Sequence, residues 1–88
     1  MKPKVVMRLF EESNDKSFDK EDRARFKRVA KIIDRIPVKT FGKLFIKNND
    51  YEFYRGFCLG QEIKNILDEN EYEIVRAVID NINCGYYE

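Results

Sequence analysis

Six cationic side chains between residues 20 and 35 are spaced so that they could bind an anion together. We call them the basic face: Lys20, Arg23, Lys27, Arg28, Lys31 and Arg35. At 100° per residue they fall on one side of a helix, and Asp34 is the only acidic residue among the later ones. An ordinary solvated face interleaves Glu with Lys at four-residue spacing, which this segment does only at its start. The pattern predicts a surface for a nucleic-acid backbone, an acidic protein or a phosphorylated small molecule, with a solvated helix face as the alternative.

Four further cations are candidates for the same role. Lys39 and Lys43 follow Arg35 at four-residue spacing and extend the basic face if residues 38–48 are helical. Arg55 and Arg76 are secondary candidates, because they hold equivalent positions in two similar stretches that contain few other cations. For each of these two arginines an ion pair is favoured over an anionic ligand.

The residue types needed for common catalytic and metal sites are missing. The sequence contains no histidine, which excludes Ser-His-Asp triads and histidine acid–base catalysis. It contains neither GxxxxGK[ST] nor GxGxxG. Cys58 and Cys84 are too few for a zinc site, and Cys58 is interpreted as a small core residue. The acids between 68 and 73 lack EF-hand spacing and are typical of a helix N-terminus. We therefore expect a protein that is not an enzyme and uses no cofactor or metal.

The basic face requires a helix over residues 20–36, and local signals predict one. Asp19 is a good N-cap residue. Pro37 ends the segment, because the residue before a proline is disfavoured in the α region. An apolar stripe with helical period runs opposite the cations and is expected to face the core: Phe26, Val29, Ala30, Ile33 and Ile36.

Two stretches in the second half resemble each other and predict two more helices. Residues 49–57 read NDYEFYRGF and residues 70–78 read NEYEIVRAV. Each has Glu three residues after Asn, which is the spacing of a capping box. The pattern predicts helices over 50–67 and 70–83, with Tyr51 and Tyr72 as a packed pair and Gly85 as the stop signal after the second helix. The core face of the first helix is predicted to contain Phe53, Phe57, Gly60, Ile63 and Leu67.

These elements predict a mainly α fold, a small bundle of three or four helices. Residues 3–12 would supply the fourth, although they and residues 39–47 could also be extended. The alternative is an α+β, ferredoxin-like fold with strands near 4–10, 43–47 and 51–59. In that fold, residues 55–57, Arg-Gly-Phe, resemble the first three positions of the RNA-recognition-motif signature. The resemblance stops there, since Cys58 replaces the small residue that should follow.

Length and charge limit the organisation of the chain. Eighty-eight residues with 43% hydrophobic residues predict a single domain over 1–88. Residues 1–48 contain 14 Lys and Arg and 7 Asp and Glu, a charge of +7, whereas residues 49–88 contain 3 and 9, a charge of −6. Such opposite halves suggest pairing with each other or with further copies of the chain. No segment reads as a signal peptide or membrane span, so we expect no membrane association and a cytoplasmic location.

Three functions remain open from the sequence. The leading hypothesis is a small regulatory or inhibitory protein that binds a protein partner, possibly as a homo-oligomer. Its composition fits an AT-rich genome, and short chains of this kind are common in phage and mobile elements, where they block host or defence factors. The second hypothesis is a nucleic-acid-binding protein that uses the basic face. The third and weakest is sequestration of an anionic nucleotide ligand between subunits.

Overall fold

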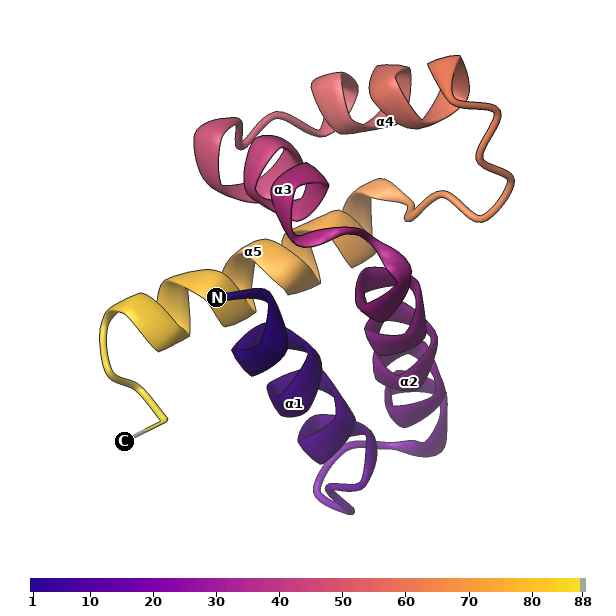
Figure 1. Ribbon diagram of the computed structural model, residues 1–88. Coiled ribbons are helices and arrows are strands. Elements are labelled where there is room, and N and C mark those ends of the chain that lie inside the picture. The colour runs from indigo at the N-terminus through magenta and orange to yellow at the C-terminus, as the bar shows by residue number, and fades with distance from the viewer. Residues whose placement is uncertain (88) are drawn as a thin grey trace.

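The computed structural model describes residues 1–87, and every regular element in them is helical. In chain order the elements are α1 (Lys2–Ser13), α2 (Lys20–Arg35), α3 (Val38–Phe41), the π-helical η1 (Gly42–Lys47), α4 (Tyr51–Gly60) and α5 (Glu69–Asn83) (Figure 1). The prediction of a mainly α fold is confirmed. The alternative with strands near 4–10, 43–47 and 51–59 is wrong, because these residues lie in α1, η1 and α4.

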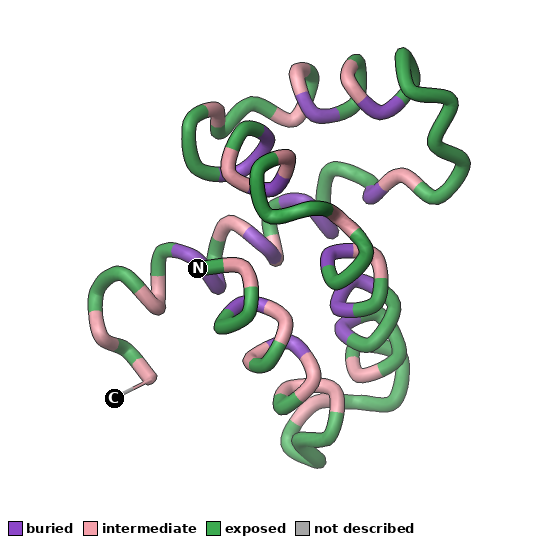
Figure 2. Tube along the Cα trace, in the orientation of Figure 1, coloured by how far each residue is buried: buried purple, intermediate pink, exposed green. Residues whose placement is uncertain are grey.

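Helices α1 and α2 form an antiparallel hairpin that packs against α5, while η1 and α4 lie on the other side of α5 (Figure 1). The buried residues lie on the sides of the elements that face one another (Figure 2). Aromatic rings fill its centre, with Phe45 stacked on Tyr72 at a centroid distance of 5.0 Å and Tyr54 against both. Tyr51 also packs on Tyr72, at 5.7 Å, as the repeated pattern predicted.

Helix α2 begins and ends where its sequence signals place it. The Asp19 carboxylate accepts a hydrogen bond from the Asp22 N–H, 2.8 Å away, which satisfies one unpaired donor of the first turn. Ile36, before Pro37, leaves the helical region with ψ 127°. The predicted apolar stripe is buried from Phe26 to Ile33, and Ile36 is half-buried. The opposite side of α2 is thereby left to solvent.

Helix α5 starts at Glu69, one residue earlier than predicted, and uses a different cap. The N-cap is Asp68, not Asn70, and Glu71 completes a capping box in which each side chain accepts from the other residue's N–H. Glu71 is 4% exposed and also accepts from Arg28 of α2, so this cap ties the two helices together. Gly85, with φ 75°, ends the helix as predicted.

The helix predicted over 50–67 is shorter, because the chain leaves it after Gly60. Its N-cap is Asp50 rather than Asn49. At its C-terminus Glu62 adopts φ 57°, and the N–H groups of Glu62 and Ile63 donate to Leu59 and Cys58, which is the hydrogen-bond pattern of a Schellman motif.

The predicted core face of this helix was also wrong in part. The buried residues of α4 are Tyr54 and Cys58, one position on from Phe53 and Phe57, which are only half-buried. Gly60 and Ile63 are exposed, and Leu67 is buried but lies in the irregular connection. The prediction that Cys58 is a core residue is confirmed, since it is 2% exposed.

Candidate binding site

The exposed side of α2 presents three cations at regular spacing. Lys27, Lys31 and Arg35 follow one another at four-residue intervals and are all exposed, because the buried stripe occupies the other side of the helix. Four residues correspond to about 6 Å along an α-helix. Together they form a ladder of positive charge on one surface.

The other three residues of the basic face have different environments. Lys20 is exposed in the first turn, away from the ladder. Arg23 is half-buried, and within residues 1–87 its Nε is buried without a hydrogen-bond partner. Arg28 is about half exposed and forms an ion pair with the buried Glu71. Arg28 therefore has a structural role as well as a place on this surface.

Lys39 and Lys43 lie on a neighbouring surface, formed by α3 and η1. These residues are helical, as the extension of the basic face required. With Lys47 they surround the exposed side chains of Val38 and Ile46. The Lys43 ammonium lies 5.1 Å from the centre of the Phe57 ring, within cation–π range.

The two secondary candidates differ from each other. Arg76 is half-buried, donates to the Phe45 carbonyl and lies 3.5 Å from the Asp80 carboxylate. The contact with Phe45 holds η1 against α5, and the contact with Asp80 lies within α5. Arg55 is exposed on α4 and forms no ion pair with another of residues 1–87. The two arginines are thus equivalent in sequence but not in structure.

An apolar cavity of about 320 Å³ lies beside the C-terminal end of α2. It is enclosed by α2, α3, η1, α4 and the connection that follows α4. Most of its lining is apolar: Ile32, Ile36, Pro37, Leu44, Tyr54, Phe57, Cys58 and Ile63. Arg35, Thr40, Lys64 and Asn65 complete it, and within residues 1–87 no acidic residue lines it. Its size falls at the lower end of the range for ligand pockets.

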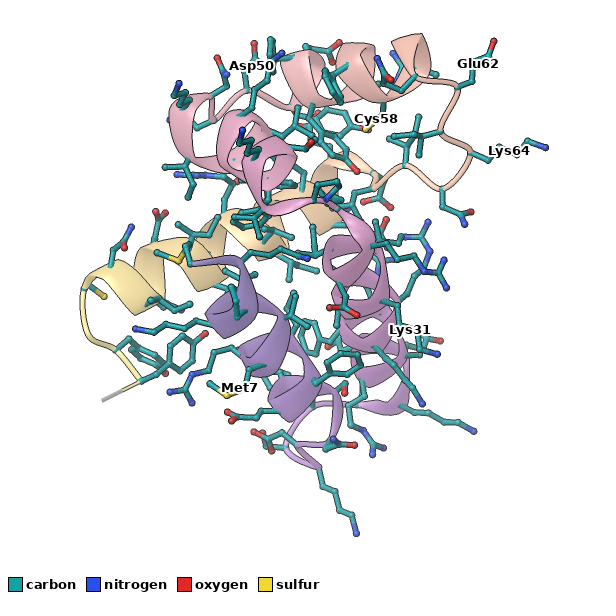
Figure 3. All side chains as sticks on the ribbon, in the orientation of Figure 1. Met7, Lys31, Asp50, Cys58, Glu62 and Lys64 are labelled. Carbon is teal, nitrogen blue, oxygen red and sulfur yellow. The ribbon has the colours of Figure 1, made fainter. Side chains whose placement is uncertain are left out.

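A shallow groove of about 390 Å³ continues from this cavity along α2. The two share Ile32, Arg35 and Asn65, and the groove adds Ala24, Lys27, Arg28 and Lys31, again with no acidic residue from the described part of the chain. We call the cavity and this groove together the α2 groove. One wall is α2 and the other is the connection 61–67, seen as the long orange segment between α4 and α5 (Figure 1). Lys31 and Lys64 lie on these two walls, at the same edge of the view in Figure 3.

The polar groups inside the α2 groove favour binding over chemistry. Burial raises the pKa of the Cys58 thiol, so that it stays protonated at neutral pH. Burial likewise raises the pKa of the Tyr54 hydroxyl, which already accepts a hydrogen bond from the Leu67 N–H. Within residues 1–87, the other titratable side chains that line the α2 groove are lysines and arginines. What the α2 groove offers is positive charge beside an apolar cavity.

Sequence reasoning found the cations of α2 but missed the cavity and its second wall. The cations follow a helical period that one segment reveals by itself. The cavity combines residues from α2, α3, α4 and the connection, which was predicted to be helix. The one local signal for a wall residue is Lys64, the only lysine among residues 49–88.

The comparisons with known proteins add no information about function, so a function is inferred from the geometry of the structure. No family model, curated protein or solved structure matches this chain. Among residues 1–87, none of the helices combines the length and apolar character needed to cross a membrane.

Proposed function

We propose that this chain is a small regulatory or inhibitory protein that acts by binding, and that its α2 groove receives an acidic segment of a partner protein. The observation that carries the proposal is the α2 groove itself, where a ladder of exposed cations leads into an apolar cavity and no acidic residue among 1–87 lines either part. A partner that matches this surface carries carboxylates next to a bulky apolar side chain.

The two parts of the α2 groove contribute differently to binding. Burying one Leu- or Phe-sized side chain contributes about 1.5–3 kcal/mol, whereas an exposed ion pair contributes about 0.2–1 kcal/mol. The apolar cavity therefore makes the larger single contribution to the free energy of binding. The cations select an acidic partner and speed its association.

The apolar cavity also favours a protein partner over a nucleic acid. Phosphate groups would use Lys27, Lys31 and Arg35 but would leave the cavity empty. Nucleic-acid binding remains the alternative, and it predicts an affinity that falls steeply with salt, with a log–log slope of about −0.9 for each contacted phosphate of duplex DNA.

The test is affinity capture from a lysate of the source organism, with and without nuclease, using four forms of the protein. The double variant Lys27→Glu/Lys31→Glu reverses the charge ladder, and Thr40→Trp fills the cavity from α3. Lys4→Glu/Lys16→Glu makes the same charge change at exposed positions outside the α2 groove and serves as the control.

We expect the same proteins to be captured by the parent and the control, and to be lost with both α2 groove variants, regardless of nuclease. Cross-links from the captured protein should map to residues 27–35 and 63–65. Capture that survives both α2 groove variants would contradict the proposal. Capture that nuclease abolishes would replace it with the nucleic-acid alternative.

A further inference from the structure

We propose that the partner segment lies in the α2 groove as an extended chain and pairs its backbone with residues 64–66. This inference rests on the proposed function and adds the conformation and side-chain pattern of the segment. The occupant is an acidic peptide with carboxylates at alternate positions and a bulky apolar residue at one end.

The connection 61–67 is fixed at both ends and unpaired in its middle. At its start, the N–H groups of Gln61, Glu62 and Ile63 donate to carbonyls of α4. At its end, the Leu67 N–H donates to the Tyr54 hydroxyl, and the Leu67 carbonyl accepts from the Tyr51 hydroxyl, both at 3.1 Å. This arrangement holds the segment in place without using the backbone between its ends.

Residues 64–66 have backbone groups available to a partner. Their N–H and C=O groups form no hydrogen bond with any of residues 1–87. Lys64 and Asn65 are exposed, and Asn65 lines both parts of the α2 groove. A row of unpaired backbone donors and acceptors is the feature by which an exposed sheet edge recruits an added strand.

The spacing of the cations matches an extended chain. Lys27, Lys31 and Arg35 recur about every 6 Å along α2. Alternate side chains of an extended chain recur about every 6.6–6.8 Å on one face. Three carboxylates at alternate positions can therefore face the three cations. The next alternate position beyond Arg35 reaches the apolar cavity, which Arg35 also lines.

A bound helix fits this surface less well. Carboxylates at four-residue spacing on a helix would also face the ladder. The backbone of a helix is already hydrogen-bonded within itself, so residues 64–66 would gain no partner. The free backbone on the second wall of the α2 groove is what favours the extended form.

The probes are two capped heptapeptides, Glu-Thr-Glu-Thr-Glu-Thr-Leu and its reverse, because the strand could run in either direction. Each is also made with N-methyl groups on its Glu residues alone or on its Thr residues alone. Successive backbone N–H groups of an extended chain point to opposite sides, so only one of the two methylated series removes the donors that face residues 64–66. A helical peptide with Glu at four-residue spacing and a Leu at its end is the comparison.

We expect one heptapeptide to bind more tightly than the helical peptide in a chemical-shift titration. One methylated series should lose about tenfold or more in affinity, equivalent to about 1.4 kcal/mol, while the other binds like the unmodified peptide. Hydrogen exchange at the amides of residues 64–66 should slow when the peptide binds.

Substitution of Asn65 supplies a matched pair in the protein. Asn65→Pro removes an N–H that has no partner in the free chain, so it should leave the melting temperature close to that of the parent and weaken peptide binding. Asn65→Ala removes the same side chain but keeps the N–H, so it should bind the peptide more tightly than Asn65→Pro. The methylated peptides keep the inference testable if the proline variant fails to fold.

Three results would overturn the inference. Equal binding by both methylated series, or unchanged exchange at residues 64–66 in the complex, would show that backbone pairing is absent. Tighter binding by the helical peptide would show that the occupant is a helix, and the proposed function would stand. The proposed function fails separately, when capture from the lysate survives Lys27→Glu/Lys31→Glu and Thr40→Trp.

Discussion

At the scale of single residues, Glu12 is a carboxylate whose ionised form is destabilised by its surroundings in the folded chain. It is half-buried on α1 and accepts a hydrogen bond from the Tyr87 hydroxyl at 3.1 Å. Burial raises its pKa above 4.5, helped by the nearby charges of Asp15 and Glu11, and the Tyr87 hydrogen bond only partly offsets this. The ionised form of Glu12 is therefore disfavoured in the folded chain.

We predict that Glu12→Gln stabilises the protein at neutral pH but not in acid. Because the folded-state pKa is raised, the contribution of Glu12 is most favourable below pH 4.5 and is lost as the pH rises through the folded value. Glutamine keeps the acceptor for Tyr87 and carries no charge at any pH. Urea unfolding at pH 4 and pH 7 should show a gain for the variant only at pH 7. A gain of equal size at both values would mean that ionisation of Glu12 is not the cause.

The residues of the candidate site show how far single positions can be predicted. The ladder of Lys27, Lys31 and Arg35 follows from helical period alone, because one helix decides which side faces solvent. The ion pair of Arg28 with Glu71 does not, since it joins residues of α2 and α5 that only the tertiary fold brings together. Helical period predicted which side of α2 these cations occupy but could not separate the cations that have partners from those that have none.

At the scale of elements, the helix ends that depend on a single nearby residue were predicted best. Asp19, Pro37 and Gly85 act through their own conformational preferences and were all placed correctly. The end of α4 was not predicted, because the residue with a left-handed backbone conformation there is Glu62 and not a glycine. Leu67 looked like one more helical core residue. Its position is fixed instead by hydrogen bonds between its backbone and the hydroxyl groups of Tyr51 and Tyr54, which no local pattern indicates.

Helix α5 ends in a second Schellman motif, in which the N–H groups of Gly85 and Tyr86 donate to the carbonyls of Ile82 and Asn81. The two motifs allow a matched prediction of opposite sign. Glu62→Gly should raise the free energy of unfolding by about 0.5–1 kcal/mol, since glycine adopts the left-handed region without the Cβ clash that Glu62 meets. Gly85→Ala places a Cβ in the same region at the end of α5 and should lower it by about 1 kcal/mol. Chemical denaturation of both variants against the parent measures the difference. Loss of stability in Glu62→Gly would show that the Glu62 side chain contributes more than its backbone conformation costs.

At the scale of the whole molecule, the two oppositely charged halves do not neutralise each other. Among residues 1–87, three ion pairs form, and only Arg28–Glu71 joins a residue before 49 to one after it. Apart from Arg23, the cations of α2, α3 and η1 remain exposed, as do the carboxylates Glu52, Glu69, Glu73 and Asp80 of α4 and α5. The folded chain thus keeps the charge asymmetry that its sequence has, with a basic surface and an acidic surface on one small body.

This asymmetry predicts head-to-tail self-association that depends on salt. At 0.01 M salt the screening length is about 30 Å, close to the 37 Å long axis of the molecule, whereas at 0.15 M it is about 8 Å. Light scattering at micromolar protein should therefore give a mass above 10.6 kDa at low salt and the monomer mass at 0.15 M. Lys27→Glu/Lys31→Glu reverses part of the basic surface and should remain monomeric at both. A monomeric parent at low salt would contradict the prediction. A dimer mass at both salt concentrations would contradict it too, because association would then depend on apolar contacts such as those of the exposed Val38 and Ile46.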